Sequence, residues 1–145
     1  MKNRLLFCAL MGILTACQQE TDIQPGTSTL AGEAAGTYQT NFYLDPSYVA
    51  MSADQLPYAE LKTESDNSVT LVYTKLYPTK VSQIVQHISL VRQSAGIQLF
   101  MDGLNIGTLQ TDRIFTNSGM ERQGQLLRLN LQSESRNDLN FVGSK

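Results

Sequence analysis

From residue 36 onward, apolar and polar side chains alternate with period two, the pattern of strands that have one buried face. The alternation is clearest in residues 68–77, where Val69, Leu71 and Tyr73 share one face. Residues 113–116 continue or restart this pairing pattern. The alternation predicts about eight strands, at residues 37–43, 58–62, 68–77, 87–93, 97–101, 104–110, 125–132 and 139–142.

Residues with strong turn preferences separate these segments. Asp45-Pro46 ends the first segment and opens a longer connection over residues 45–57. Asp102-Gly103 is typical of a two-residue hairpin turn. Short strands with turns between them predict an all-β domain, either an antiparallel up-and-down barrel or a sandwich.

Residues 81–88 fit two patterns. Four apolar residues recur there at helical spacing, yet all four are β-branched, which favours a strand: Val81, Ile84, Val85 and Ile88. We predict a loop or a short turn of helix that leads into the strand at residues 87–93.

The N-terminus has the layout of an export signal. Lys2 and Arg4 make a basic start, and residues 5–14 follow as ten residues without charge. That run is too short to span a bilayer, which takes about 20 residues, and it has the length of a secretory signal. A core segment of a cytosolic protein is the alternative, and the basic start and the polar stretch that follows disfavour it.

Residues 14–17, Leu-Thr-Ala-Cys, resemble the lipobox of bacterial lipoproteins. The resemblance implies that the signal over residues 1–16 is cleaved between Ala16 and Cys17 and that Cys17 carries the lipid. Ordinary signal cleavage that leaves Cys17 as a buried thiol is the alternative, but it places Leu14 where a small residue is preferred. Residues 17–34 are polar and rich in Gly, Ser and Thr, which predicts a flexible tether before a domain over residues 35–145.

The residues after Cys17 indicate where the anchored protein goes. Gln18 stands where an aspartate often signals retention in the inner membrane, so the resemblance implies a cell-envelope protein of the outer membrane. Glu20 and Asp22 resemble acidic surface-export signals of some Gram-negative lineages. A periplasmic and a surface-facing orientation both stay open.

The charge limits the kinds of partner that the protein can bind, and the cysteine content limits its disulfides. The chain has 11 Lys and Arg and 13 Asp and Glu; loss of Lys2 and Arg4 leaves 9 against 13, a net charge near −4. Such a balance disfavours nucleic acid, because phosphate contacts need a basic face. Cys8 leaves with the signal, so Cys17 is the sole thiol of the mature chain and no intramolecular disulfide can form.

The β-rich part resembles lipocalin-like (calycin-type) small lipoproteins over about residues 35–143. The resemblance rests on Gly36-Thr37-Tyr38, on the hairpin series 88–91, 97–101 and 106–109, and on the lipoprotein start. Tyr38 stands where lipocalins proper carry tryptophan. The resemblance implies a barrel that holds a small apolar or amphipathic ligand, with Tyr38, Tyr73, Leu99 and Leu129 as candidate binding residues.

Motifs for catalysis and cofactors are scarce. His87 is the single histidine, no nucleophile-elbow, phosphate-loop or dinucleotide motif occurs, and the acidic residues fall mostly in predicted turns. We therefore expect neither an enzyme nor a metal or cofactor site. A pair of carboxylates of the glycosidase type is the enzymatic alternative.

Two functions remain. The first is a membrane-tethered binding module with a cavity of roughly 300 Å³ or more inside the barrel. The second is a structural or interaction lipoprotein, whose barrel is filled by its own side chains and whose outer face meets another envelope protein. The volume inside the barrel distinguishes them.

Overall fold

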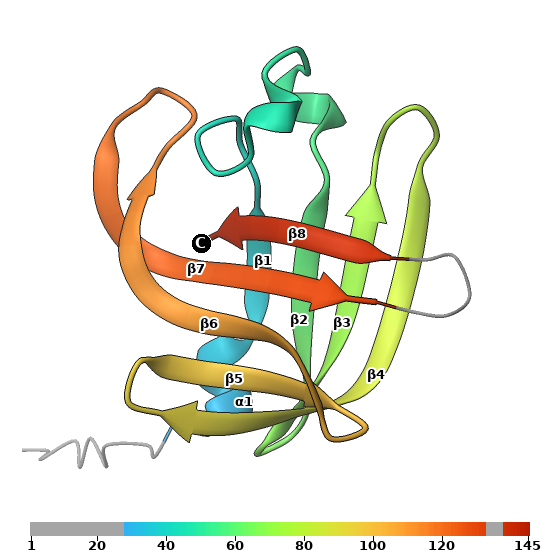
Figure 1. The fold of residues 1–145 in the computed structure, drawn as a ribbon, viewed down its shortest axis with the longest axis vertical. Coiled ribbons are helices and arrows are strands. Elements are labelled where there is room, and N and C mark those ends of the chain that lie inside the picture. The colour runs from blue at the N-terminus through green and yellow to red at the C-terminus, as the bar shows by residue number, and fades with distance from the viewer. Residues whose placement is uncertain (1–27, 133–137) are drawn as a thin grey trace, which may run out of the picture.

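The computed structural model describes residues 28–132 and 138–145. Eight antiparallel strands close into a barrel in chain order (Figure 1). The prediction of an all-β up-and-down architecture is confirmed, and the closed barrel is compatible with a lipocalin-like fold. The strands are β1 (Gly36–Gln39), β2 (Tyr58–Ser65), β3 (Ser68–Lys75), β4 (Val81–Gln93), β5 (Gly96–Met101), β6 (Leu104–Phe115), β7 (Glu121–Leu131) and β8 (Leu139–Ser144).

Two of the predicted connections form as expected. Asp102 and Gly103 both have positive φ, 51° and 80°, and they join β5 to β6 as a two-residue hairpin turn, the geometry for which this pair is suited. The connection from β1 to β2 contains two single turns of 3-10 helix, η1 (Pro46–Tyr48) and η2 (Ala53–Gln55).

Strand β4 corrects the prediction of a loop or helical turn at residues 81–88. Val85 and Ile88 are both buried, and a bulge between them explains their spacing of three. His87 has φ 60° there, and its backbone N–H donates to the Glu64 carboxylate at 3.1 Å. The extra residue of the bulge therefore gives the apolar positions of this strand a spacing like that of a helix.

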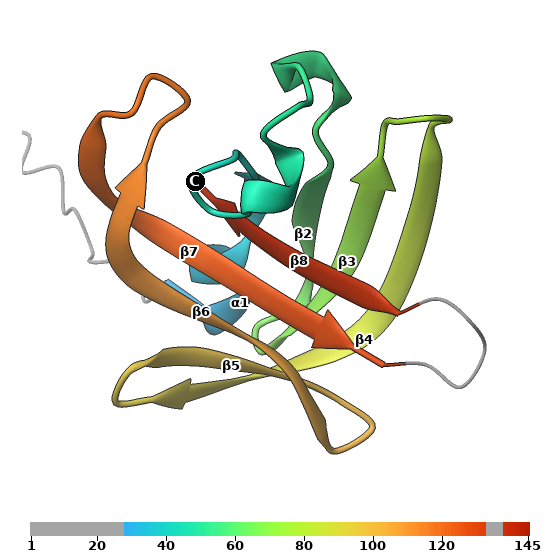
Figure 2. The same ribbon diagram turned by 45° about the horizontal axis from the view of Figure 1, so that its top comes forward.

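Strands β6 and β7 are longer than predicted. The segments expected at 104–110 and 113–116 form one strand, and β7 begins at Glu121 instead of residue 125. Pairing of β6 with β5 ends at Leu109, and β7 is bonded to the C-terminal segment as far as Gln125, which exchanges two backbone hydrogen bonds with Lys145. The outer part of this hairpin, residues 111–124, therefore rises past the ends of its neighbours and is called here the projecting hairpin (Figures 1 and 2).

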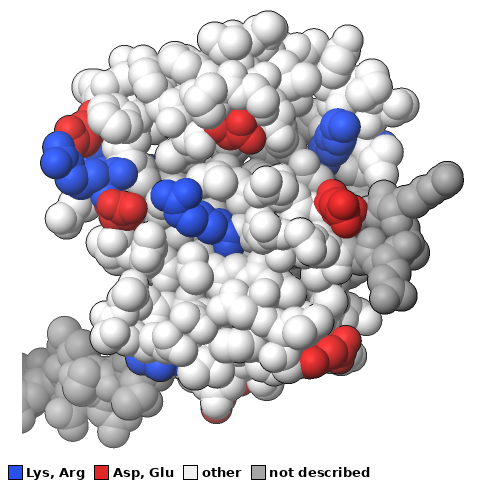
Figure 3. All heavy atoms as spheres, viewed as in Figure 1, with Lys and Arg blue, Asp and Glu red and all other residues white. Residues whose placement is uncertain are grey.

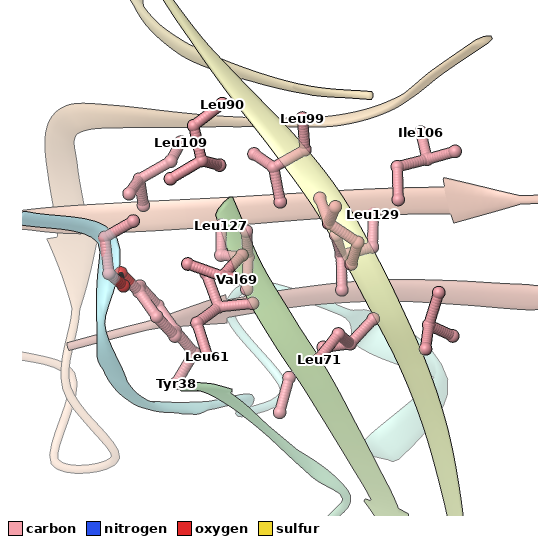
Figure 4. Packing of buried hydrophobic residues seen from close by; sticks show 14 of the residues in the cluster. Tyr38, Leu61, Val69, Leu71, Leu90, Leu99, Ile106, Leu109, Leu127 and Leu129 are labelled. Atoms are coloured by element: carbon pink, nitrogen blue, oxygen red, sulfur yellow. Dashed lines mark hydrogen bonds between the residues drawn. The ribbon is translucent and has the colours of Figure 1, made fainter. Parts of the chain in front are cut away.

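The inside of the barrel is filled by its own side chains (Figure 4). The largest of them are at most 2% exposed, so they are packed closely against one another. The structure therefore has a packed core where a calyx would hold a ligand. These core residues are Tyr38, Leu61, Val69, Leu71, Ile88, Ile97, Leu99, Leu109, Leu127, Leu129 and Phe141.

One end of the barrel is covered by α1 (Leu30–Ala34), and it is called here the closed end (Figure 1). Thr29 caps this helix by accepting from the Gly32 N–H at 3.0 Å, and Ala31 and Ala34 are fully buried. Helix α1 thus lies within residues 17–34, the range predicted for the tether. Among the described residues, no helix combines the length and the apolar character needed to cross a membrane.

The opposite end carries the connections 40–57, 76–80 and 116–120, and it is called here the open end (Figures 1 and 2). The predictions for the signal, the lipobox, Cys17 and the start of the tether lie outside the described residues.

Candidate functional site

The structure places three of the four predicted ligand-binding residues in the packed core. Tyr38, Leu99 and Leu129 are at most 1% exposed, and Leu99 and Leu129 lie near each other among core side chains (Figure 4). A ligand-binding role for them stays a prediction, and in this structure they contact other core residues.

Tyr38 fastens the closed end. Its hydroxyl donates to the Ala34 carbonyl at 2.6 Å, and burial raises its pKa above the usual range. The Lys145 ammonium lies 5.1 Å from the centre of the Tyr38 ring and donates to the Glu33 carbonyl at 3.1 Å. Burial lowers the pKa of Lys145. These contacts hold α1 against the barrel.

Tyr73 lies at the open end and is partly buried. Its ring meets Phe141 edge to face at 5.7 Å between centroids. Burial, and then the neighbouring Tyr48, raise the pKa of Tyr73 to about 12. Its hydroxyl interacts with that of Tyr48, which ties η1 over the end of the core.

Two hollows adjoin each other at the open end, on either side of the end of β1. The first is called the polar hollow; its volume is about 180 Å³ and most of its lining is polar. It lies in the wall of the barrel, where the projecting hairpin rises past the end of β8. Its lining residues are Gln39, Thr40, Asn41, Ile114, Phe115, Thr116, Asn117, Arg122 and Ser144.

The second is called the apolar hollow; its volume is about 260 Å³ and it lies under the connection that carries η2. It shares Gln39, Thr40 and Asn117 with the polar hollow. The other lining residues are mainly apolar: Ala53, Leu56, Pro57, Tyr58 and Leu76.

Thr40 stands between the two hollows and has an unusual hydroxyl. The residue is 2% exposed, and Oγ1 has no hydrogen-bond partner among the described residues. Thr74 is buried to the same degree, yet its hydroxyl pairs with Ser82 Oγ at 3.0 Å. Since buried polar groups are nearly always paired, Thr40 marks a place where the fold leaves a polar group unused.

Asn41 fixes the wall of the polar hollow. Its Nδ2 donates to the Phe115 carbonyl at 2.7 Å, and its Oδ1 accepts from the backbone N–H groups of Tyr43 and Leu44, each at 3.0 Å. Tyr43 also packs on Gly119, where a Cβ atom would lie 2.6 Å from the tyrosine oxygen. The projecting hairpin and the start of the 40–57 connection are therefore held together before any ligand arrives.

The charge at the polar hollow is positive. Arg122 is exposed, makes no ion pair with a described residue, and no Asp or Glu lines the hollow. Glu121, the neighbouring acid, is ion-paired with Arg113, and that hydrogen bond lowers its pKa. Charged side chains of both signs are sparse and scattered on the face shown in Figure 3.

Two other hollows are larger than either of these, but their chemistry is less suited to a site. One of about 330 Å³ lies beside α1, and its cation Arg92 is already held by Glu33, with one hydrogen bond of 3.0 Å and a second that is shorter. Another of about 280 Å³ is a wide depression on the outer wall of β6 to β8 beside Arg128.

Sequence reasoning missed Thr40, Asn117 and Arg122. Alternation from Tyr38 places Thr40 on the inner face, but no sequence signal says that its hydroxyl stays unpaired. Within residues 28–132 and 138–145, no three His, Cys, Asp or Glu side chains come together as a metal site. When the chain is compared with known proteins, no family model, curated protein or solved structure matches it.

Proposed function

We propose that this protein is a lipid-anchored lipoprotein of the cell envelope, and that its barrel binds a small amphipathic molecule at the open end without catalysis. The observation that carries the proposal is the pair of adjoining hollows, one polar and one apolar, which share Thr40 and Asn117. Small-molecule sites typically combine an apolar wall with a few polar groups that fix orientation.

The packed core favours a binding site at the open end and disfavours one inside the barrel. A ligand inside would have to displace side chains such as Leu99 and Leu127, which have no exposed surface. Displacing close-packed side chains costs several kcal/mol, on the order of what a cavity-forming substitution costs. The hollows at the open end need no such rearrangement.

The position of α1 fits a tethered domain. The chain enters the barrel at the closed end, through Thr29 and α1, and the candidate site lies at the other end. With Cys17 as the anchor, the tether joins the domain at the end opposite the site, which leaves the site free to meet molecules in solution.

The surroundings of His87 support a role without catalysis. His87 lies on the outside of β4, exposed, with Nδ1 3.4 Å from the Glu64 carboxylate, and among the described residues it makes no hydrogen bond to a hydroxyl or thiol group. It is also distant in chain and sheet position from the residues that line the two hollows.

The experiment is native mass spectrometry of the full chain purified from its own host. We expect a small molecule to accompany the wild type and to be lost from Ala53→Trp, because the indole fills the apolar hollow. Ala95→Trp is the matched control, since Ala95 is also an exposed alanine beside a hollow but lies on the β4–β5 turn. Retention of the same molecule by Ala53→Trp would overturn binding at the open end.

A second candidate function, contact with another envelope protein, has its own supporting observation. Phe42, Tyr43 and Phe115 stack at the open end with centroid distances of 4.0 and 5.6 Å, and each remains at least 40% exposed. Exposed aromatic clusters are frequent at protein interfaces. If no small molecule accompanies the wild type and a cross-linker placed at Phe115 captures one envelope protein, this second function replaces the first.

The anchor is tested separately. Cys17→Ser expressed in the host is expected to leave the membrane fraction, because two acyl chains give stable attachment and none remain in the variant. An unchanged distribution of Cys17→Ser between membrane and soluble fractions would contradict the lipoprotein assignment.

A further inference from the structure

We infer that the open-end site takes an amphipathic anion, whose carboxylate or phosphate head lies in the polar hollow and whose apolar part lies in the apolar hollow. This inference rests on the proposed function and names the class of its ligand. The two hollows together reach the range of roughly 300–1,000 Å³ that is typical of small-molecule sites.

The polar hollow offers donors and no competing anion. Arg122 supplies a guanidinium, and the side chains of Gln39, Asn117 and Ser144 supply neutral donors around it. With no carboxylate in the lining, a negative head would meet hydrogen-bond donors without repulsion. Arginine is suited to this task because its fork of N–H groups matches the geometry of carboxylate and phosphate oxygens.

Arg122 is available for such a head. Arg92 and Arg113 are each engaged by a glutamate, Glu33 and Glu121, and both of those carboxylates have lowered pKa values because their arginine partners donate to them. Arg122 has no acidic partner among the described residues. Since Glu121 is bound by Arg113 on the same hairpin, it does not neutralise its neighbour.

Thr40 gives an independent observation at the same place. Its hydroxyl is buried and has no partner in the part of the chain that the structure describes, although the residue lines both hollows. Rotation of this side chain toward the hollow would let the hydroxyl donate to an oxygen of the head, and this would satisfy a group that the fold leaves unpaired. The junction of the two hollows is therefore the expected position of the head, with Arg122 on its outer side.

The apolar hollow sets the rest of the ligand. Leu56, Pro57 and Leu76 give it an apolar wall, and Tyr58 is the sole phenol in its lining. Asp54 is close in the chain but exposed and outside the lining, so it would disfavour an anion in this hollow and not in the other. A short alkyl or ring system fits here, since burial of apolar surface favours it.

The test uses the full chain with Cys17→Ser, so that no attached acyl chain competes, and backbone NMR shifts with four probes. The probes are octanoate, octyl phosphate, octanol and octyltrimethylammonium. We expect the two anions to shift residues of both hollows saturably and to bind more tightly than octanol. The tighter of the two anions identifies the head as carboxylate or phosphate, and either result supports the inference.

Variants locate the head. Arg122→Gln should weaken binding of the anions by roughly tenfold or more, the value of a charge-assisted hydrogen bond. Arg128→Gln is the matched control, since Arg128 is exposed on the outer wall of the same strand, and it should leave the affinity unchanged. Thr40→Val should weaken the anions severalfold while the shifts of the remaining backbone show an intact fold.

The outcomes separate this inference from the proposed function. Octanol or the cation binding as tightly as the anions, or anion binding that is indifferent to Arg122→Gln, overturns the anionic ligand while binding at the open end stands. If no probe shifts residues at the open end but Ala53→Trp loses the host molecule, the inference of an anionic ligand is overturned and binding at the open end stands. A host molecule retained by Ala53→Trp overturns both.

Discussion

The two ends of the barrel differ in how completely their polar groups are paired. At the closed end, the Tyr38 hydroxyl binds Ala34, Lys145 binds carbonyls around α1, and Glu33 is paired with Arg92. At the open end, neither the Thr40 hydroxyl nor the Arg122 guanidinium has a hydrogen-bond or ion-pair partner, respectively, among the described residues. Both ends belong to one continuous barrel, so the difference is not one of fold.

This difference indicates a division of roles. A sequence folds to one structure when its apolar residues are buried and its polar groups are hydrogen-bonded. Departures from this rule concentrate at functional sites. The closed end and the core follow these rules. The open end departs from them in a buried hydroxyl, an exposed aromatic cluster and two hollows, which is why we assign binding there.

The largest expected effect is on stability, and it tests whether the core between the two ends is closely packed. Leu99→Ala should lower the free energy of unfolding by about 2–5 kcal/mol, measured by urea denaturation, because it opens a cavity among fully buried side chains. Leu104→Ala is the control, since Leu104 is 69% exposed, and it should change stability by less than about 0.5 kcal/mol. A loss as small for Leu99→Ala would mean that the barrel has slack inside, and a ligand inside it would again be plausible.

Alkaline pH gives the next effect. The folded-state pKa of Tyr73 is about 12, above the unfolded value of about 10, so the neutral phenol is favoured by folding. Its contribution to stability is complete below pH of about 10 and is lost as the pH rises from there to about 12, on the order of 2 kcal/mol. Tyr38 changes stability in the same direction.

Denaturation at several pH values checks this prediction. Tyr73→Phe should lose stability less steeply between pH of about 10 and 12 than the wild type does, since one proton fewer is released on unfolding. Equal slopes for the variant and the wild type would show that the Tyr73 ring is hydrated, and that η1 does not cover this end of the core.

A smaller effect is expected at the closed end. Tyr38→Phe removes the hydrogen bond to the Ala34 carbonyl and should lower the free energy of unfolding by about 1 kcal/mol. Tyr77→Phe serves as its control, because Tyr77 is exposed and its hydroxyl makes no hydrogen bond to a described residue. Faster hydrogen exchange in α1 of Tyr38→Phe would support the fastening role, whereas exchange unchanged from the wild type would contradict it.

The sequence predicted the barrel well where local patterns decide the structure. Alternation identified β3 almost to the residue, and the Asp102-Gly103 pair identified the β5–β6 turn. It misjudged β4, because the bulge at His87 shifts the buried positions from a spacing of two to three. It also missed α1, since a helix of five residues is too short to show a period, even with Thr29 at its N-cap.

The candidate site could not be predicted from the sequence, for a different reason. The polar hollow exists because Gln39 pairs with Ser144 and because the projecting hairpin rises past that pair, which places Arg122 near the end of β1. Register and strand overhang of this kind depend on tertiary pairing. Whether the Thr40 hydroxyl finds a partner depends on the same pairing.

The most direct test of the division between the two ends is a matched pair of threonine substitutions. Thr40 and Thr74 are equally buried, but Thr74 is bonded to Ser82 and Thr40 has no partner among the described residues. In urea denaturation, Thr74→Val should lower the free energy of unfolding by about 1 kcal/mol, whereas Thr40→Val should raise it by about 1 kcal/mol, because it removes a buried hydroxyl that nothing satisfies. An equal loss of stability in both variants would contradict the account, since the Thr40 hydroxyl would then already be paired in the free protein.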